Sequence, residues 1–340
     1  MGHNTPQFLY IMGRGHSGST VLDALLGSGK NLQSVGEIVS GMPRTEDLCS
    51  CGEKIKNCYF WNAVKKKFEE ESDYSWNQAT EQIVEQAHIK SFYKTWRGHN
   101  ANDINRLKEI NQTLFKSISA VSGNKVVVDS SKEFTRGLFL AKYTANGKII
   151  HLIRNPLAIL ASNLLRIKEG KFKILRYTFK ARKTAFPFIC LSAAGWLIGN
   201  ALGELVGLVE RGKVLRVRYE DLCEYPSREL KRIEAFSGHD LTDVIKSIEE
   251  SKEIKIEHMI AGNRMRNNGS FVFSPSRKSH RKLPLQHSLL GVLITWPFML
   301  KYGYLTQRLQ HSISKLKTHT TRREIETKQP AFSEVPVSSK

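Results

Sequence analysis

A glycine-rich segment near the amino terminus has the residue types and spacing of an anion-binding loop. Gly13, Gly15 and Gly18 permit a tight turn and let backbone N–H groups approach an anion closely. The apolar run Phe8–Met12 before them is typical of a buried strand, and Thr20–Gly27 after them has the composition of a helix. The segment therefore predicts a strand–loop–helix unit whose helix amino terminus holds phosphate or sulfate.

The loop differs from the P-loop of ATP-using enzymes at the position that carries the charge. Gly13 and Gly18 have the spacing of that motif, but Ser19 and Thr20 follow where a lysine and a hydroxyl residue are required. Because that lysine stabilises the β- and γ-phosphates, its absence argues against ATP hydrolysis and phosphoryl transfer. An ordinary strand–turn–helix junction is the alternative for this segment taken alone.

A second segment supplies residues of the same kind. Lys148–Ile153 is another candidate strand, Arg154 follows it directly, and Pro156 suits the first turn of a helix expected over Leu157–Arg166. Ser162 comes eight residues after Arg154. A fixed guanidinium and a hydroxyl two helical turns away could together hold a phosphate dianion.

The two segments together resemble the sulfotransferases that use 3′-phosphoadenosine 5′-phosphosulfate (PAPS). In that family a strand–loop–helix unit binds the 5′-phosphosulfate, and a later arginine and serine bind the 3′-phosphate. Further segments share the resemblance, which covers about residues 8–305: Val126–Lys132, Tyr219–Leu222, His258–Asn263, and Cys49–Gly52 with Cys58 and Trp61, the last group being typical of a bacterial or carbohydrate-type subgroup. The resemblance implies PAPS as co-substrate, 3′-phosphoadenosine 5′-phosphate (PAP) as product, and no required metal.

The resemblance also implies which residues bind the donor. The expected residues are Arg14, Gly15, His16, Ser17, Gly18, Ser19 and Thr20 in the loop, Arg154 and Ser162 at the 3′-phosphate, Tyr219 at the adenine, and Arg264 and Arg266 in a closing loop. Ordinary packing is the alternative for Tyr219, and plain surface charge is the alternative for the last two arginines.

One position departs from the family pattern. His16 stands where the family usually has lysine or arginine, and histidine is only partly charged near neutral pH. Lys132, which follows the candidate strand Lys125–Asp129, is our first choice for the missing charge, and Arg14 is the second. Asp129 and Ser131 are expected either to orient Lys132 or to cap the next helix.

The implied reaction is an in-line transfer of a sulfuryl group to an acceptor hydroxyl or amine. It requires positioning, charge stabilisation and one general base. We expect Glu37, at the end of the strand Leu32–Gly36, to be that base, with Lys132 and His16 stabilising charge. His16 or His258 is the alternative base, and a capping or salt-bridged role is the alternative for Glu37.

Five short apolar segments are typical of buried strands, and helical stretches separate them. This alternation predicts an α/β fold, a three-layer sandwich around a mainly parallel five-stranded sheet of the P-loop-like kind. Ligands are expected at the carboxyl ends of its strands. The segments are Phe8–Met12, Leu32–Gly36, Lys125–Asp129, Lys148–Ile153 and Lys213–Arg218.

The chain is long enough for one large domain or two small ones. We expect a single α/β domain over residues 1–310, with residues 41–123 as a helical insertion that helps to form the acceptor pocket. Residues 318–340 are polar and contain Pro330 and Pro336, so we expect a disordered basic tail.

The charge of the chain favours anionic partners. Lysine and arginine number 52 against 32 acidic residues, a net charge of +20. We expect no nucleic-acid partner, because no helix-turn-helix, RNP or zinc-finger signature is present. The basic blocks Arg166–Lys183 and Arg277 onward are either solvated faces or sites for an acidic sugar or an anionic membrane. The first block favours a carbohydrate or glycolipid acceptor.

Three of the five cysteines, Cys49, Cys51 and Cys58, are close together in the sequence. They could bind zinc with a fourth ligand from elsewhere, but Cys-x-Cys is tighter than the usual zinc spacing. We therefore interpret them as reduced thiols in a turn and expect no metal site. Cys190 and Cys223 have apolar neighbours and are expected in the core.

No signal peptide is expected, because a strand candidate begins by residue 8. Phe186–Val209 is long enough to span a membrane, but Asn200 and Glu204 interrupt it, so we interpret it as a core helix. Leu289–Leu300 is too short to span and could lie in a membrane interface. The expected location is cytoplasmic, with peripheral membrane contact.

Two rival functions remain from the sequence. A P-loop kinase or NTPase would need magnesium and a Walker B carboxylate, for which Asp129 is the candidate. A non-catalytic nucleotide- or polyanion-binding protein is expected if Glu37 and Lys132 lie far from the glycine-rich loop.

Overall fold

The computed structural model describes residues 7–98, 100–168, 173–174, 177–178, 185–274 and 283–305. Its contacts divide the chain into two compact units, residues 1–294 and 295–340, and the fold and site below belong to the first. The expected single domain over 1–310 stays a prediction. The expected tail at 318–340, much of the basic block that begins at Arg166, and the start of the block at Arg277 lie outside the described residues.

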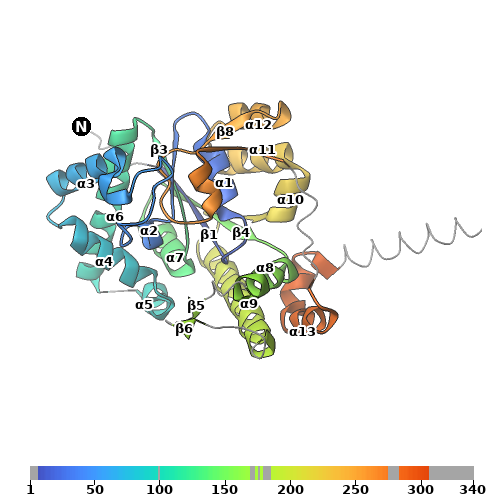
Figure 1. Ribbon diagram of the computed structural model, residues 1–340. Coiled ribbons are helices and arrows are strands. Elements are labelled where there is room, and N and C mark those ends of the chain that lie inside the picture. Colours follow the sequence, from blue (N-terminus) through green and yellow to red (C-terminus); the bar gives the residue numbers. More distant parts are fainter. Residues whose placement is uncertain are drawn as a thin grey trace, which may run out of the picture. The chain divides into compact units, whose positions relative to one another are not determined.

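A parallel sheet forms the centre of the first unit (Figure 1). Within the described residues it has five strands in the order β2-β3-β1-β4-β7, and every neighbouring pair is parallel. Because the strands are parallel, their carboxyl ends meet at one edge. The predicted α/β fold is confirmed, and each predicted strand is present within a few residues of its expected bounds. The strands are β1 (Gln7–Gly13), β2 (Leu32–Gly36), β3 (Val126–Lys132), β4 (Gly147–Ile153) and β7 (Val214–Arg218).

Helices cover both faces of this sheet, as Figure 1 shows. The α-helices of the described residues are α1 (Ser19–Gly27), α2 (Ile38–Gly41), α3 (Tyr59–Glu71), α4 (Trp76–Ala87), α5 (Phe92–Arg97), α6 (Ala101–Ser122), α7 (Phe134–Tyr143), α8 (Pro156–Lys168), α9 (Ala185–Val209), α10 (Tyr219–Glu224), α11 (Pro226–Ser237), α12 (Thr242–Glu249) and α13 (Leu285–Lys301). The shorter elements are the 3₁₀ helices η1 (Ile55–Asn57), η2 (Ile89–Ser91) and η3 (Arg264–Asn268) and the strands β5 (Lys173–Ile174), β6 (Tyr177–Thr178), β8 (Glu253–Lys255) and β9 (Ser270–Val272).

The central strand β1 supplies alternate side chains to two cores, as the two-residue period of a strand requires. Phe8, Tyr10 and Met12 pack with residues of α3, α4, α6 and α7 on one face. Leu9 and Ile11 pack with residues of α1, α11 and α12 on the other. Burial on both faces explains why the strand is an unbroken apolar run in the sequence.

The helical segment between β2 and β3 has clear start and stop signals. Ser75 and Gln78 form a capping box at the start of α4. The Asn100 side chain accepts a hydrogen bond from the Asp103 backbone N–H at the start of α6, and Gly123 ends that helix in a left-handed conformation. These helices pack on the same face as Phe8, so the insertion lies against α7 and borders the carboxyl edge of the sheet.

Helix α9 is long and apolar enough to cross a membrane by length and composition, the only such helix among the described residues. One side of it is buried through residues that include Ile189, Ala193 and Trp196. The Trp196 indole N–H donates to the Arg154 backbone carbonyl at 3.0 Å. The interpretation of α9 as a core helix fits these contacts, which also fix the end of β4.

Candidate functional site

The glycine-rich loop connects β1 to α1 through two left-handed residues, His16 (φ 68°) and Gly18 (φ 93°). A Cβ atom on Gly18 would lie 2.1 Å from Cε2 of Tyr219, so the tyrosine ring rests directly on the loop. A Cβ on Gly13 would lie 2.5 Å from the Leu152 carbonyl oxygen, whereas Gly15 has nothing within 4 Å. Gly13 and Gly18 are therefore required by packing, and Gly15 is not.

Two arginines contact the loop, one directly after β4 and one from α8. Arg154 donates from Nη1 to the His16 carbonyl at 2.8 Å, and its guanidinium carbon lies 4.7 Å from the centre of the Tyr219 ring. Arg166 Nη1 lies 3.3 Å from His16 Nε2. Ser162, half-buried, is four residues before Arg166 on α8 and so shares its helix face. Arg166 was expected only as part of a basic block, although its four-residue spacing from Ser162 indicates that the two residues share a helix face.

The hydroxyl of Ser17 is the unsatisfied polar group of this loop. Ser17 is 1 % exposed, and its Oγ has no hydrogen-bond partner within the described structure. Buried polar groups normally have partners, and an unpaired one destabilises the fold. An anion oxygen in the loop would supply the missing acceptor.

Glu37 and Lys132 form an ion pair at the carboxyl edge of the sheet. Their side chains are 8 % and 19 % exposed. Lys132 ends β3 with a φ of 76°, a left-handed conformation that costs a non-glycine residue roughly 1–2 kcal/mol. Backbone strain of this kind concentrates at functional sites.

The ion pair is adjacent to the loop helix. The position of a Cβ atom on Gly262 (φ 95°) lies 3.0 Å from Thr20 Oγ1 and 3.3 Å from Glu37 Oε1. The Asn263 N–H donates to Thr20 Oγ1 at 3.1 Å. Glu37 is therefore next to the first turn of α1. The non-catalytic alternative expected Glu37 and Lys132 to lie far from the loop, and this arrangement argues against it.

The segment before Gly262 holds Glu37 in place. The Glu37 N–H donates to the Ile260 carbonyl at 2.8 Å, and the Ile260 N–H donates to the Val35 carbonyl at 3.0 Å. Gly36 (φ 77°) allows this approach, because a Cβ there would lie 2.3 Å from the Ile260 carbonyl oxygen. The end of β2 and residues 258–263 thus form one unit.

Asp129 has hydrogen-bond partners that were not predicted from the sequence. Its carboxylate accepts from Arg136 Nε at 3.0 Å and from the Ser131 N–H and hydroxyl at 2.9 and 2.5 Å, and Asp129 and Arg136 are fully buried. Glu133, not Asp129, is at the N-cap of α7. Helix capping, one of the two roles offered for Asp129 and Ser131, is therefore absent. The hydrogen bonds that the Asp129 carboxylate already accepts argue against a Walker B magnesium ligand. Ser131 Oγ also accepts from the Val39 N–H, which fixes α2.

Asp23 is a buried acid beneath the loop that the sequence analysis missed. It accepts hydrogen bonds from the hydroxyls of Ser34 (2.6 Å) and Ser130 (2.5 Å). Burial raises its pKa to about 7, although the two hydroxyls oppose the shift. Asp23 links α1 to β2 and β3 directly below the site.

A cavity of about 440 Å³ lies beside the ion pair. Most of its lining is apolar, and four lining residues, 84 and 87–89, come from the insertion. Val39 follows Glu37 by two residues and Glu133 follows Lys132 directly, so the cavity borders the ion pair. The lining consists of Arg14, Val39, Val84, Ala87, His88, Ile89, Glu133, Phe134, Thr135, Gly195, Ile198, Gly199 and Leu202.

Two charged residues, Arg14 and Glu133, line this cavity. Each has solvent-exposed surface, although protein atoms surround most of its charged group. Burial raises the pKa of Glu133, against the nearby charges of Lys132 and Arg14, and burial lowers the pKa of Arg14. A Cβ on Gly199 would lie 2.5 Å from Arg14 Cδ, so this side chain runs along α9. Arg14 thus lines the cavity, on the α9 side of the loop.

The remaining predicted donor residues differ in exposure. Arg264 is exposed, whereas Arg266 is buried, donates from Nη1 to the Met259 carbonyl at 3.3 Å, and has its pKa lowered by burial. Arg266 is therefore directed into the fold, unlike a free surface charge. Burial also raises the pKa of Tyr219, so its phenol stays neutral.

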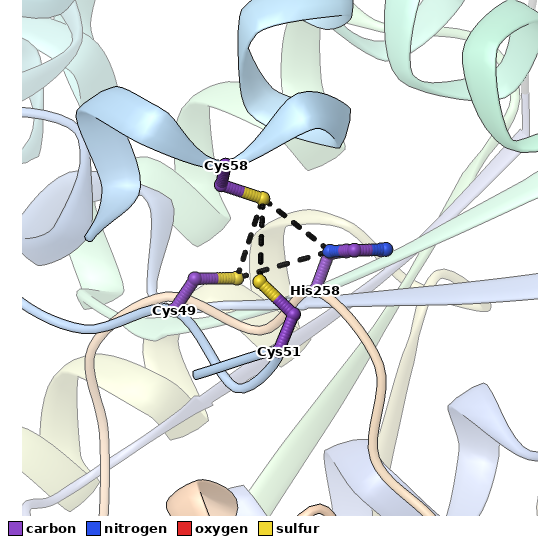
Figure 2. Close-up of side chains that lie close together, drawn as sticks. All are labelled: Cys49, Cys51, Cys58 and His258. Carbon is purple, nitrogen blue, oxygen red and sulfur yellow. Dashed lines mark hydrogen bonds between the residues drawn. The ribbon is translucent and has the colours of Figure 1, made fainter. Parts of the chain in front are cut away.

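Cys49, Cys51, Cys58 and His258 form a second group of side chains (Figure 2). The sulfur atoms of Cys49, Cys51 and Cys58 and one ring nitrogen of His258 all lie within 4.8 Å of one another. The three cysteines are thus joined by a histidine 200 positions beyond Cys58, a partner that the sequence left unassigned. Nδ1 of His258 faces the sulfurs and Nε2 faces Tyr59 Oη at 2.8 Å, so neither ring nitrogen faces Glu37 as an alternative base would.

A family model describes this combination of elements. The model of the sulfotransferase family matches residues 7–243, more than half of the chain. The chain belongs to the sulfotransferase family. The glycine-rich loop, β2, and β4 with the Arg154 that follows it all lie inside the matched region.

The chain is also similar to three solved structures that are described as sulfotransferases. The sulfotransferase domain of the Synechococcus PCC 7002 olefin synthase is 17 % identical, with a TM-score of 0.46 over 88 % of this chain and 96 % of that one. The sulfotransferase domain from the curacin biosynthetic pathway is 15 % identical, with a TM-score of 0.49 over 86 % and 97 %. A mouse sulfotransferase complexed with PAP is 14 % identical, with a TM-score of 0.45 over 92 % and 90 %. No curated protein matches the chain significantly.

Proposed function

We propose that this sulfotransferase moves a sulfuryl group from PAPS to a hydroxyl or amine of an acceptor, with a carbohydrate or glycolipid as the acceptor class. The observation that carries the proposal is the Glu37–Lys132 ion pair beside Thr20 at the start of α1. A carboxylate and a cation thus lie next to the glycine-rich loop, whose Ser17 hydroxyl has no partner in the described structure.

The donor would occupy the loop and the surface of α8. Backbone N–H groups of the loop, with the hydroxyls of Ser17 and Thr20, suit the 5′-phosphosulfate. Arg154 and Ser162 suit the 3′-phosphate, and Arg166 on the same helix face adds a third group. Tyr219, packed on Gly18 and under Arg154, is well placed to border the adenine.

The chemistry follows from the ion pair. When PAPS is bound, Lys132 would leave Glu37 and contact the oxygen that bridges sulfur and the 5′-phosphate. There it would stabilise the negative charge that grows on this oxygen. Glu37 would accept the proton of the acceptor hydroxyl while the acceptor oxygen bonds to sulfur. The bond from sulfur to the 5′-phosphate oxygen breaks, and PAP leaves with that electron pair. His16, next to Arg166, adds partial charge at most.

The cavity of about 440 Å³ is our candidate acceptor pocket. Its mostly apolar lining favours an acceptor with an apolar part, such as a glycolipid, over a bare sugar. Arg14 and Glu133 offer polar contacts inside it. The insertion contributes part of this lining, in keeping with the role expected from the sequence.

A surface that contacts a membrane would suit a glycolipid acceptor. Leu285, Leu289 and Leu293 of α13 are 75, 63 and 71 % exposed and follow one another at four-residue spacing, so they share one helix face. We propose a cytoplasmic protein whose leucine face touches an anionic membrane surface. Co-sedimentation with vesicles should occur for the native chain and weaken when the three leucines are replaced by serine.

Turnover of ³⁵S-labelled PAPS with a panel of glycans and glycolipids tests the proposed function. Glu37→Gln should lower kcat by about 10²-fold or more, the usual contribution of a general base, with PAP affinity nearly unchanged. Glu46→Gln, at an exposed salt-bridged glutamate, is the matched control and should keep full activity. Equal turnover by the Glu37 variant and the native enzyme would remove Glu37 as the base.

A further inference from the structure

We propose that Cys49, Cys51, Cys58 and His258 bind one zinc ion in a closed structural site (Figure 2). Two sulfur–sulfur distances are 3.6 Å (Cys51–Cys58) and 3.8 Å (Cys49–Cys58). His258 Nδ1 lies 3.4 Å from the Cys58 sulfur and 3.9 Å from the Cys49 sulfur.

These spacings are those of ligands around one tetrahedral zinc ion. Zinc–sulfur bonds near 2.3 Å and zinc–nitrogen bonds near 2.0 Å put the sulfurs about 3.8 Å apart and each sulfur about 3.5 Å from the nitrogen. Three thiolates and one imidazole are also the soft, borderline donors that tetrahedral zinc prefers. All four donor atoms lie within 4.8 Å of one another, which leaves room for a single ion and not for an iron–sulfur cluster.

The surroundings orient these ligands. With Nδ1 on the metal, Nε2–H of His258 can donate to Tyr59 Oη at 2.8 Å, the outer contact that metal-binding histidines usually have. The Phe60 ring stacks on the imidazole with 4.7 Å between ring centres. Gly52 (φ 94°) turns the chain directly after Cys51 and allows the tight Cys-x-Cys spacing that the sequence analysis counted against zinc.

The site would join two distant parts of the chain beside the ion pair. The Ser50 N–H and hydroxyl both donate to the Met259 carbonyl at 3.1 Å, and the Trp61 indole donates to the His258 carbonyl at 2.9 Å. Ile260, two residues after His258, accepts the Glu37 N–H. An ion bound to His258 therefore fixes the segment that holds Glu37, and the metal has a positioning role in the fold rather than a role in the reaction.

The test is the metal content of the full-length protein, purified without a metal-binding tag. We expect about one zinc ion per chain by inductively coupled plasma mass spectrometry. Cys51→Ala should lower this content to about one-tenth or less; Cys51 is exposed, so the substitution leaves no buried cavity. Cys190→Ala, at a cysteine of α9 outside the group, is the matched control and should keep the full content.

Two further readouts keep the test decisive even if a variant folds poorly. Co²⁺ added to the metal-free native protein should give thiolate charge-transfer and tetrahedral ligand-field absorption, and the Cys51 variant should not. A strong chelator should lower the unfolding temperature of the native protein and of Cys190→Ala, but not that of Cys51→Ala. Substoichiometric metal in the native protein, bound iron, or a Cys51–Cys58 disulfide found by mass spectrometry in fresh protein would each overturn the proposal.

Discussion

Replacing Gly18 by alanine tests how the glycine-rich loop packs against Tyr219. A left-handed alanine costs roughly 1–2 kcal/mol. Its Cβ would also lie 2.1 Å from the Tyr219 ring, an overlap whose relief typically costs about 1–3 kcal/mol. We expect a stability loss of about 2–5 kcal/mol, or roughly 3–8 °C in the unfolding temperature of a unit of this size. Because Arg154 lies over the displaced ring, PAP affinity should fall by about 10- to 100-fold, the worth of one charged hydrogen bond.

Control substitutions at two other glycines distinguish backbone strain from steric overlap as the cause of the stability loss. Gly212 has a φ of 78° and no atom within 4 Å of its Cβ position, so Gly212→Ala introduces strain without overlap. Gly15 has neither strain nor overlap, so Gly15→Ala should lie within about 0.5 kcal/mol of the native protein. Thermal unfolding and calorimetric titration with PAP measure both quantities. A Gly18 variant that matches Gly212→Ala in stability and in affinity would refute the proposed packing of Tyr219 on the loop.

Three other substitutions probe the surroundings of the site. Asp23→Asn should remove a pH dependence: the folded pKa of about 7 exceeds the unfolded value of 3.8, so the folded state retains a proton that the unfolded state loses. Stability of the native protein should therefore fall by about 1 kcal/mol per pH unit between pH 4 and 7, relative to the variant, in urea titrations. Gly262→Ala should abolish most turnover, because its Cβ would contact Thr20 and Glu37, while Gly269→Ala, equally left-handed but with open space, should not. Arg136→Met should destabilise the protein by about 3–5 kcal/mol, because it leaves a buried carboxylate unpaired, and adding Asp129→Asn should restore part of the loss in denaturant titrations.

The strands and the loop could be predicted because short stretches of sequence specify them. β1 and β4 are apolar runs buried on both faces, and the glycines of the loop follow β1 directly. Glu37 and Lys132 could be expected at one edge because parallel strands bring their carboxyl ends together. The ion pair between them follows from β2 and β3 being neighbours, which the sequence did not specify.

Contacts between distant segments could not be predicted. His258 joins the three cysteines only because residues 258–260 run beside the end of β2, and no short-range pattern encodes that path. Two other contacts are close in sequence, because Arg136 pairs with Asp129 and Arg266 donates to the Met259 carbonyl, each across seven residues. They depend on how the chain turns between those residues, which residue types alone do not specify.

The most direct test of the donor site is a calorimetric titration of the protein with PAP, AMP and ATP–Mg²⁺. We predict tight binding of PAP alone, and a loss of about 10-fold or more in Arg154→Ala, because that arginine would hold the 3′-phosphate. Binding of ATP in preference to PAP, or binding of PAP that Arg154→Ala leaves unchanged, would contradict the proposed donor site.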